Sequence, residues 1–241
     1  MDSFKSYYEK ENKKKFDGLE KGSYERKTRS RWEFAKNHIA KNSSVLDVAC
    51  GDGTLGKQLQ EKQCQVYGID ISDLAVNKAK EAGIDARFCD ISRDTFPFGD
   101  NMFDYVTLLC CLEHIIDPIH ALRETLRVTK SGGKVIITLP NAVNIKNRID
   151  FFLGKVPTDL LHVKDGEGMH IQFYNYRNEF ENKVLTTFKD NCSIELKKGD
   201  LKKLKQEHKW FMRTIYQFLI KIAPNLFSQY IHWVLIKKTT K

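Results

Sequence analysis

From Ser44 onward, short apolar runs alternate with helical patterns, and this alternation constrains the fold more than any other feature of the chain. The runs lie at 45–49, 65–69, 86–89, 103–109 and 134–139. Such alternation is typical of parallel strands joined by crossover helices. The sequence therefore predicts an α/β protein with a doubly wound, mostly parallel sheet.

Punctuation residues mark the helices between these strands. Ser72 can cap a helix that stops at Gly83, and Asp117 opens a second helix that ends near residues 132–133. Residues 24–40 carry apolar side chains at helical spacing, which predicts an extra helix across the front of the sheet.

The second half of the chain has a looser pattern. Residues 154–172 are Gly-rich and His-bearing, which indicates an insertion. A helix near 178–188, a strand near 193–196, a long helix near 204–222 and a last strand at 230–236 complete the chain. With 241 residues, the chain is long enough for one sizeable core, so we expect a single domain with a seven-stranded sheet.

The composition bears on the cellular location of the protein, the state of its cysteines and its charge. No stretch is apolar over the roughly 18 residues that a spanning helix needs, and the first residues lack the apolar core of a secretory signal, so we expect a cytoplasmic protein. The six cysteines form no CxxC pair, and we expect reduced thiols without zinc or disulfides. The net charge of +9 gathers toward the chain ends, where lysines either meet anionic groups or simply face water.

A glycine loop follows the first expected strand. Gly51, Gly53 and Gly56 have a spacing that fits either a nucleotide-type cofactor or an ordinary tight turn. Asp47, at the end of that strand, suits a ligand with an ammonium group and would repel a pyrophosphate, which argues against NAD.

Two more carboxylates end the next two strands. Asp70 can accept both hydroxyls of a ribose, and Asp90 can accept from an exocyclic adenine amine while Ile91 covers the ring. A single aspartate after a strand is usually a turn or helix cap. Three in successive units, together with the glycine loop, indicate one shared ligand.

These motifs resemble the class I S-adenosylmethionine-dependent methyltransferase superfamily, and within it the type 11 and MetW-like group. The resemblance covers about residues 29–141. It rests on 45–55 (VLDVACGDGTL), Gly68-Ile69-Asp70, 103–106 (FDYV), 112–115 (LEHI) and Gly132-Gly133-Lys134, with MetW-like character in Leu139-Pro140-Asn141.

The resemblance implies a Rossmann-like fold with an antiparallel last strand. It divides the chain into an N-terminal helical cap (1–43), a cofactor-binding half (44–141) and a substrate-side half (142–241). It also implies the residues that bind S-adenosyl-L-methionine: Arg29, Asp47, Ala49, Gly51, Gly53, Asp70, Ile71, Asp90, Ile91 and Leu109. Ala49 stands where the usual pattern has its first glycine, and Arg26 and Arg31 compete with Arg29 for the role of carboxylate-binding arginine.

Two histidines are candidates for a general base in methyl transfer to a hydroxyl. His114 follows the fourth strand, at the carboxyl edge where open α/β sheets bind ligands, although it could equally pin the loop. His170 lies in the insertion, where it and His162 flank residues 165–168. Their spacing matches no metal site, so we expect none.

The acceptor is expected to be a small molecule, a glycan or a lipid-linked compound, and O-methylation is the favoured reaction. Residues 108–111 (LLCC) lack the element that nucleic-acid amine methyltransferases use, so no nucleic acid is expected. The apolar stripe from Trp210 to Ile222 is interpreted first as core, with peripheral membrane contact as the alternative. A MetW-like partner protein without strong catalysis, and an NAD-dependent oxidoreductase, remain rival functions.

Overall fold

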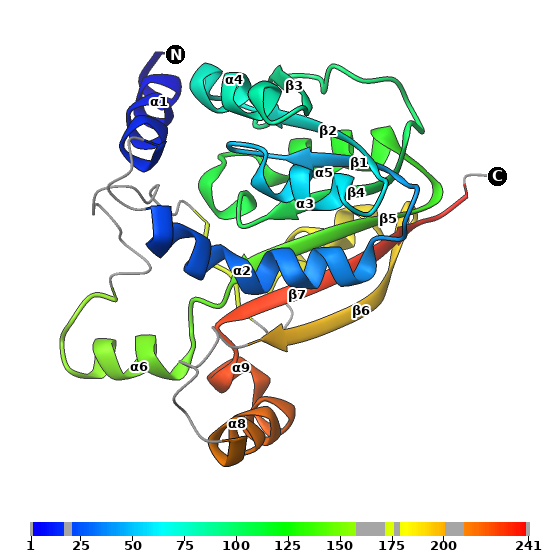
Figure 1. Cartoon of the computed structure of the whole chain (residues 1–241). Helices are drawn as coiled ribbons and strands as arrows, with labels where there is room; N and C mark the ends of the chain where they lie inside the picture. The colour runs from blue at the N-terminus through cyan, green and yellow to red at the C-terminus, as the bar shows by residue number, and fades with distance from the viewer. Residues whose placement is uncertain (1, 17–20, 158–171, 176–178, 201–209, 240–241) are drawn as a thin grey trace.

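The computed structural model describes the chain except for residues 1, 17–20, 158–171, 176–178, 201–209 and 240–241 (Figure 1). One sheet has the strand order β3-β2-β1-β4-β5-β7-β6. The neighbours from β3 to β5 pair in parallel, and β7 is antiparallel to both β5 and β6. The strands are β1 (Ser44–Val48), β2 (Gln65–Asp70), β3 (Asp85–Phe88), β4 (Phe103–Leu109), β5 (Thr129–Pro140), β6 (Cys192–Asp200) and β7 (Tyr230–Lys237). The predicted fold class is confirmed.

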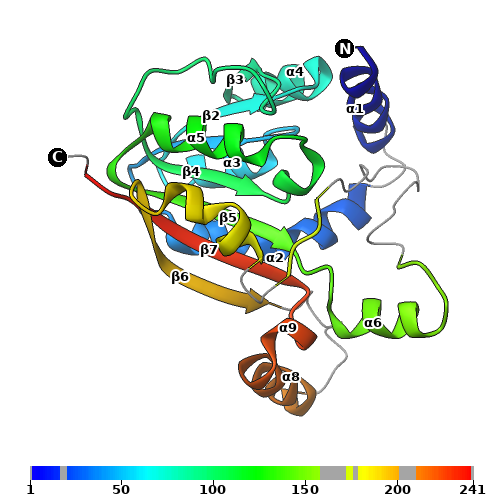
Figure 2. The same cartoon turned by 180° about the vertical axis from the view of Figure 1, so that it is seen from behind.

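Helices cover both faces of the sheet (Figures 1 and 2). The described helices are α1 (Asp2–Phe16), α2 (Lys21–His38), α3 (Thr54–Gln60), α4 (Asp73–Glu81), η1 (Leu112–His114), α5 (Pro118–Val128), α6 (Ile145–Phe152), α7 (Glu179–Lys183), η2 (Leu185–Phe188), α8 (Trp210–Ile222) and α9 (Pro224–Phe227). None of them is both long and apolar enough to cross a bilayer.

Strand side chains alternate between two apolar clusters, one on each face of the sheet. Val45 packs with residues of α2, α3 and α4 on one face. Leu46 packs with residues of α5, α7 and η2 on the other, where Trp233 is fully buried. This double covering explains the near-continuous apolar runs of the central strands.

The predicted helix starts are confirmed. The Ser72 hydroxyl accepts from Ala75 N at 3.2 Å at the start of α4, and Asp117 Oδ1 accepts from Ile119 N and His120 N at 3.0 Å at the start of α5. The helix predicted from 24–40 is α2, and it lies across the sheet as expected (Figure 1).

The predicted end of the helix after Asp117 was wrong. α5 stops at Val128, where the Thr129 hydroxyl donates to Thr125 O at 2.6 Å, and β5 begins at once. The glycines at 132–133 therefore lie in a strand. A Cβ at Gly133 would come within 3.0 Å of Asp104 O, so the glycine reflects a close approach of two strands and not a helix stop.

Several elements differ from the predicted ones. The helix expected near 178–188 is split into α7 and η2, and the strand near 193–196 extends over Cys192–Asp200. α6 was missed, although the Asn144 side chain caps it by accepting from Asn147 N at 3.1 Å. Of the predicted helix 204–222, the structure describes Trp210–Ile222. All six cysteines are free thiols, and five of them are buried.

Candidate active site

The loop after β1 turns through three left-handed residues at the carboxyl edge of the sheet. Ala49 has φ of 60°, Gly51 of 56° and Gly53 of 77°. A Cβ at Gly51 would meet nothing within 4 Å, so the backbone there borders open space. Such a loop lets a ligand approach main-chain atoms closely.

The glycines Gly51, Gly53 and Gly56 have different structural roles. A Cβ at Gly53 would lie 3.1 Å from Ala79 and Ile84, and one at Gly56 would lie 2.7 Å from Ile84 Cδ1. These two glycines therefore let α3 pack closely against α4 and the segment before β3. Of the three, Gly51 is the one whose missing side chain leaves room for a ligand.

Asp70 ties the first two strand ends together. Its Oδ2 accepts from Gly51 N and its Oδ1 from Ser72 N, each at 3.0 Å. The side chain is buried, and these two backbone hydrogen bonds fix the orientation of its carboxylate.

Asp47 is a buried carboxyl group on β1, the strand that pairs with the strand of Asp70. Its Oδ1 accepts from the Thr107 hydroxyl at 2.6 Å, across the pair that joins β1 to β4. Burial raises the pKa of Asp47 to about 7, against the lowering effect of the Thr107 hydrogen bond. A cation bound nearby would favour its charged form.

Asp90 follows β3 and also organises its own turn. Its Oδ1 accepts from Ser92 N at 3.1 Å, and Arg93 lies 2.6 Å from its Oδ2. Ile91 belongs to the apolar cluster beneath α5, whereas Ile71 and Leu109 are partly exposed. The structure thus brings Asp47, Asp70 and Asp90 to adjacent strand ends in the order β1, β2, β3.

The arginine whose charge reaches these groups is Arg31. Its positive charge lowers the pKa of Asp47 and Glu113, opposing burial. Arg29 lies on the same helix, α2, but its side chain is outside the described residues. The sequence left both arginines as candidates, and the assignment of the carboxylate-binding role to Arg29 stays a prediction.

The short helix η1 carries a buried acid that sequence reasoning did not single out. Glu113 is 1% exposed, its Oε2 has no hydrogen-bond partner among the described residues, and burial raises its pKa to about 7. His114 is partly exposed, with Nε2 3.9 Å from Glu113 Oε1. An acidic residue next to a histidine was visible in the sequence, but its complete burial was not.

The charge of Glu113 reaches two tyrosines, Tyr8 and Tyr174. Tyr174 is buried, and its hydroxyl has no hydrogen-bond partner in the described part of the chain. Tyr8 comes from α1, and burial together with the charges of Glu113 and Asp70 raises its pKa. Unsatisfied buried polar atoms are rare in folded proteins, so Glu113 and Tyr174 mark a place for a polar ligand or water.

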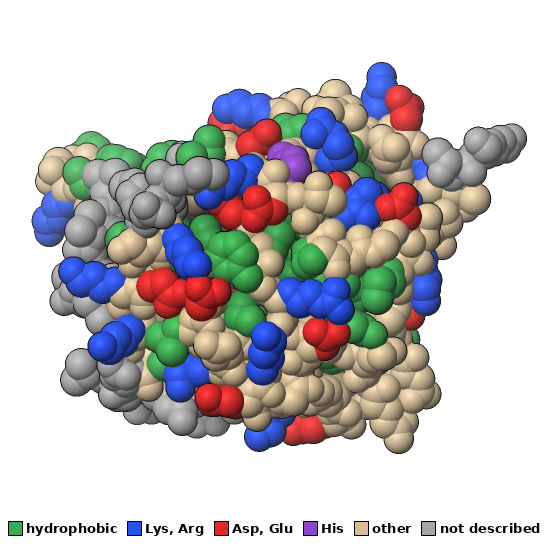
Figure 3. Space-filling view, turned by 90° about the horizontal axis from the view of Figure 1, so that it is seen from above, with side chains coloured by type: hydrophobic (Ala, Val, Ile, Leu, Met, Phe, Trp, Pro, Cys, Tyr) green, Lys and Arg blue, Asp and Glu red, His purple; other side chains and the backbone are tan. Residues whose placement is uncertain are grey.

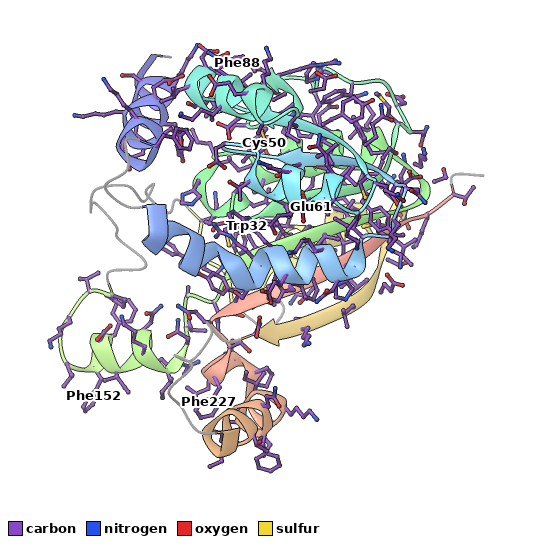
Figure 4. All side chains as sticks on the ribbon, in the orientation of Figure 1. Trp32, Cys50, Glu61, Phe88, Phe152 and Phe227 are labelled. Carbon is purple, nitrogen blue, oxygen red and sulfur yellow. The ribbon has the colours of Figure 1, made fainter. Side chains whose placement is uncertain are left out.

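Helix α1 closes one side of this edge. Lys5 Nζ lies 2.6 Å from Asp73 Oδ2, and Glu9 Oε1 accepts from Asp73 N at the start of α4. Lys5 also lies over the ring of Phe88, which Figure 4 shows at the top of the molecule beside α1. The N-terminal helix is thus held directly over the ends of β2 and β3.

The insertion carries two of the histidines that the sequence singled out. His162 and His170 lie outside the described residues. Among the residues that are described, no three His, Cys, Asp or Glu side chains are grouped to hold a metal ion.

A family model described as methionine biosynthesis protein MetW matches residues 29–234, which is most of the chain. The chain belongs to the MetW family. The resemblance to the class I methyltransferase superfamily and its MetW-like group, which the sequence motifs indicated, is thereby confirmed.

Curated relatives match a shorter part. A demethylmenaquinone methyltransferase of Renibacterium salmoninarum is 40% identical over 95 residues, covering 39% of each chain. A ubiquinone biosynthesis O-methyltransferase of Pseudomonas entomophila is 33% identical over 102 residues, covering 40% of this chain and 44% of the relative. This MetW-family chain spans less than half the length of these two relatives.

The fold has close counterparts among solved structures. An S-adenosylmethionine-dependent methyltransferase from Mesorhizobium loti superposes with a TM-score of 0.58, covering 88% of this chain and 97% of the other at 13% identity. At that identity the likeness establishes the fold.

Proposed function

We propose that this MetW-family protein is an S-adenosyl-L-methionine-dependent methyltransferase that methylates a hydroxyl of a small-molecule, glycan or lipid-linked acceptor. The observation that carries the proposal is the bonding of Asp70. Its carboxylate is oriented by Gly51 N and Ser72 N beside a glycine that borders open space. The names of the relatives and the MetW membership support the same activity.

The residues at this edge fit the cofactor moiety by moiety. The ribose hydroxyls would donate to the carboxylate of Asp70, and the ammonium group would lie near Asp47. The adenine would lie toward Asp90, Ile91 and Ile71, with Leu109 and Ala49 beside the methionine part. A pyrophosphate would meet the carboxylates of Asp47 and Asp70 instead of cations, which disfavours the NAD alternative.

When bound, the cofactor supplies a methyl group on a positively charged sulfur, which is already a strong electrophile. The protein then has to place the acceptor oxygen in line with the methyl group and exclude water, and positioning of this kind can contribute about 7–11 kcal/mol. Helix α1 contributes by covering the edge with Tyr8 and by its contacts to α4.

The acceptor hydroxyl loses its proton as its oxygen takes the methyl group. Glu113 is a suitable proton acceptor because one of its oxygens has no partner in the described chain and its pKa is raised to about 7. The Tyr174 hydroxyl, which has no hydrogen-bond partner in the described chain, is a candidate to donate to the acceptor oxygen. His114, 3.9 Å from Glu113, is the second candidate at the same place, and His170 remains a candidate from the insertion.

Cofactor binding is tested by calorimetric titration with S-adenosylmethionine and its demethylated product. Asp70→Ala should weaken both by about 1.5–3 kcal/mol, because a charge-assisted contact to the ribose is lost. Asp85→Ala is the matched control, since Asp85 is exposed at the start of β3 and should leave affinity unchanged. Equal affinity of Asp70→Ala and wild type, with melting showing both folded, would remove Asp70 from the site.

The acceptor is tested by a turnover screen in which labelled cofactor is incubated with metabolite and lipid extracts. Transfer of label to oxygen supports O-methylation, whereas label on carbon or nitrogen contradicts that part of the proposal.

The MetW family description favours a second candidate function. This protein could bind the cofactor as the partner of an amino-acid biosynthetic enzyme, without strong catalysis of its own. Cofactor binding without label transfer, together with co-purification of one tightly bound enzyme, would favour this alternative.

A further inference from the structure

A cluster of exposed apolar side chains projects from α6 and the residues after it. Only Asn147 of this helix is buried, and Phe152 is 89% exposed. Figure 4 shows Phe152 on the outer side of α6, pointing away from the sheet. The exposed apolar residues of this segment are Ile145, Ile149, Phe151, Phe152, Leu153 and Val156.

Helix α8 presents a second apolar face at the same end of the molecule. Ile215, Phe218 and Ile222 share one side of the helix by their spacing, and Phe218 and Ile222 are 61% and 64% exposed. Figures 1 and 2 both place α6 and α8 below the sheet, projecting from the body. The interpretation of this stripe as core was therefore wrong for these three residues.

The charges around these side chains have one dominant sign. Among the described side chains of segments 145–156 and 214–227, the cations are Lys146, Arg148, Lys155 and Lys221, and the one acid is Asp150, which lies 2.7 Å from Lys146. The opposite end of the molecule differs, because Figure 3 shows acidic and basic side chains interspersed there. Its pairs include Lys5 with Asp73, and Arg87 with Asp85.

We propose that the lower surface, meaning segment 145–156 together with α8, docks on the surface of an anionic phospholipid bilayer. Helices with aromatic and aliphatic residues on one face and cations beside them bind in the interfacial region of such membranes. Exposed apolar patches rimmed by polar residues mark interaction sites. Because the cations outnumber the acid, a membrane with anionic head groups has the charge that complements this patch.

A second copy of the chain fits this surface less well than lipid. A symmetric dimer would bring the same patch of each copy together, and therefore the four described cations of one copy against those of the other, with one described acid on each side. Like charges in such an interface oppose association. An anionic bilayer presents the complementary charge.

Docking would also bring the candidate active site close to the membrane. α6 begins five residues after β5 ends at Pro140, on the carboxyl edge of the sheet where Asp47 and Asp70 lie. This consequence rests on the proposed function, and it favours an acceptor held in the bilayer over a freely soluble one. The docking itself depends only on the residues of the lower surface and not on the proposed function.

The test is co-sedimentation of the full chain with unilamellar vesicles of phosphatidylcholine, alone or mixed with phosphatidylglycerol. The wild type should sediment with the mixed vesicles and much less with phosphatidylcholine alone, and added salt should release it. The double variant Phe151→Ser with Phe152→Ser should reduce the partition coefficient by roughly tenfold or more, because two aromatic rings no longer enter the interface.

Two further variants separate the explanations. Lys155→Glu should weaken binding to the anionic vesicles while leaving the apolar residues intact. Ile194→Ser, an exposed apolar residue of β6 outside the lower surface, is the control and should bind like the wild type. Melting curves establish that each variant is folded.

Wild-type protein that stays in the supernatant with anionic vesicles would overturn the proposal, as would a double variant that sediments like the wild type. A concentration-dependent dimer that Phe151→Ser with Phe152→Ser abolishes, without vesicle binding, would assign the surface to self-association instead. S-adenosylmethionine titrations of the same samples report on the proposed function separately, because cofactor binding should be equal in all four proteins.

Discussion

Ala49 holds a left-handed backbone in the middle of the candidate site, with φ of 60° and an exposed side chain. This conformation costs a residue with a Cβ about 1–2 kcal/mol. Its neighbours Gly51 and Gly53 adopt comparable angles without that cost. Strain of this kind is retained where the surrounding structure imposes it, and here the surroundings are the strand end and the glycine loop.

Ala49→Gly is therefore expected to stabilise the protein. Relief of the left-handed strain should outweigh the greater entropy of glycine in the unfolded chain, which costs about 0.4–1 kcal/mol. The net gain is about 0.5–1 kcal/mol in the free energy of unfolding, measured by urea denaturation. Ala82→Gly is the control, because Ala82 has φ of −79° and should only lose stability. A loss of similar size in both variants would contradict the strain argument.

Single substitutions can distinguish Glu113 from His114 as the proton acceptor. Replacing the true base by glutamine should lower kcat about 10²–10⁴-fold and leave cofactor affinity near the wild-type value. We expect this for Glu113→Gln, with loss of the acidic limb of the pH profile of kcat/KM near pH 7. His114→Gln should then retain most activity.

The opposite ranking would make His114 the base. If Glu113→Gln, His114→Gln and His170→Gln all stay within a few-fold of the wild-type rate on an identified acceptor, none of them is the base. Catalysis by positioning alone would then be the better account.

At the scale of elements, the first residues of β5 and the neighbouring strand β4 leave no room for a side chain at Gly133. A Cβ at Gly133 would meet Lys130 O at 2.8 Å, Thr129 Cγ2 at 2.9 Å and Asp104 O at 3.0 Å. Two of these atoms belong to the backbone, which cannot move aside as a flexible side chain could. The pairing of β4 with β5 shifts register at the same place.

Gly133→Ala should accordingly destabilise the protein by about 1–3 kcal/mol, the usual cost of overpacking. Gly99→Ala is the matched control, because a Cβ there meets nothing within 4 Å and its backbone angle is ordinary. Thermal melting of both variants tests the prediction. Equal melting temperatures would show that β4 and β5 separate easily at this point.

The same glycine pair shows where sequence reasoning reached its limit. Strand runs and helix caps were predictable because Ser72 and Asp117 act on backbone groups within three residues. Gly133 approaches Asp104, almost thirty residues away, and Gly132 has φ of 75°, and local patterns carry neither piece of information. α6 was missed although Ile145, Ile149 and Phe152 recur at helical spacing, because the pattern lasts for only eight residues.

At the scale of the whole molecule, the site combines pieces distant in sequence. The three aspartates were predictable because each ends a strand, and parallel strands bring their carboxyl ends to one edge. The positions of Tyr8 and Tyr174 beside Glu113 were not, because α1 and the segment before α7 reach the site through tertiary packing alone. The burial that raises the pKa of Glu113 follows from that packing.

Burial of two carboxyl groups makes the stability of the whole protein depend on pH. The pKa of Asp47 and that of Glu113 are both raised to about 7, from ordinary values near 4. The folded state therefore holds more protons than the unfolded state between about pH 4 and pH 7. Because stability falls with pH wherever the folded state binds more protons, these groups favour folding in acid and lose that contribution as pH rises through about 7.

The free energy of unfolding of the protein without ligand should thus decrease between pH 5 and pH 8, with each group contributing up to about 3 kcal/mol. Urea denaturation across this range measures it, and Asp47→Asn combined with Glu113→Gln should flatten the dependence. A cationic ligand reverses the trend, because it stabilises the charged form of Asp47 and should bind more tightly at pH 8 than at pH 6. Wild type and double variant with the same slope would mean that both carboxyl groups are ionised in the folded protein well below pH 7.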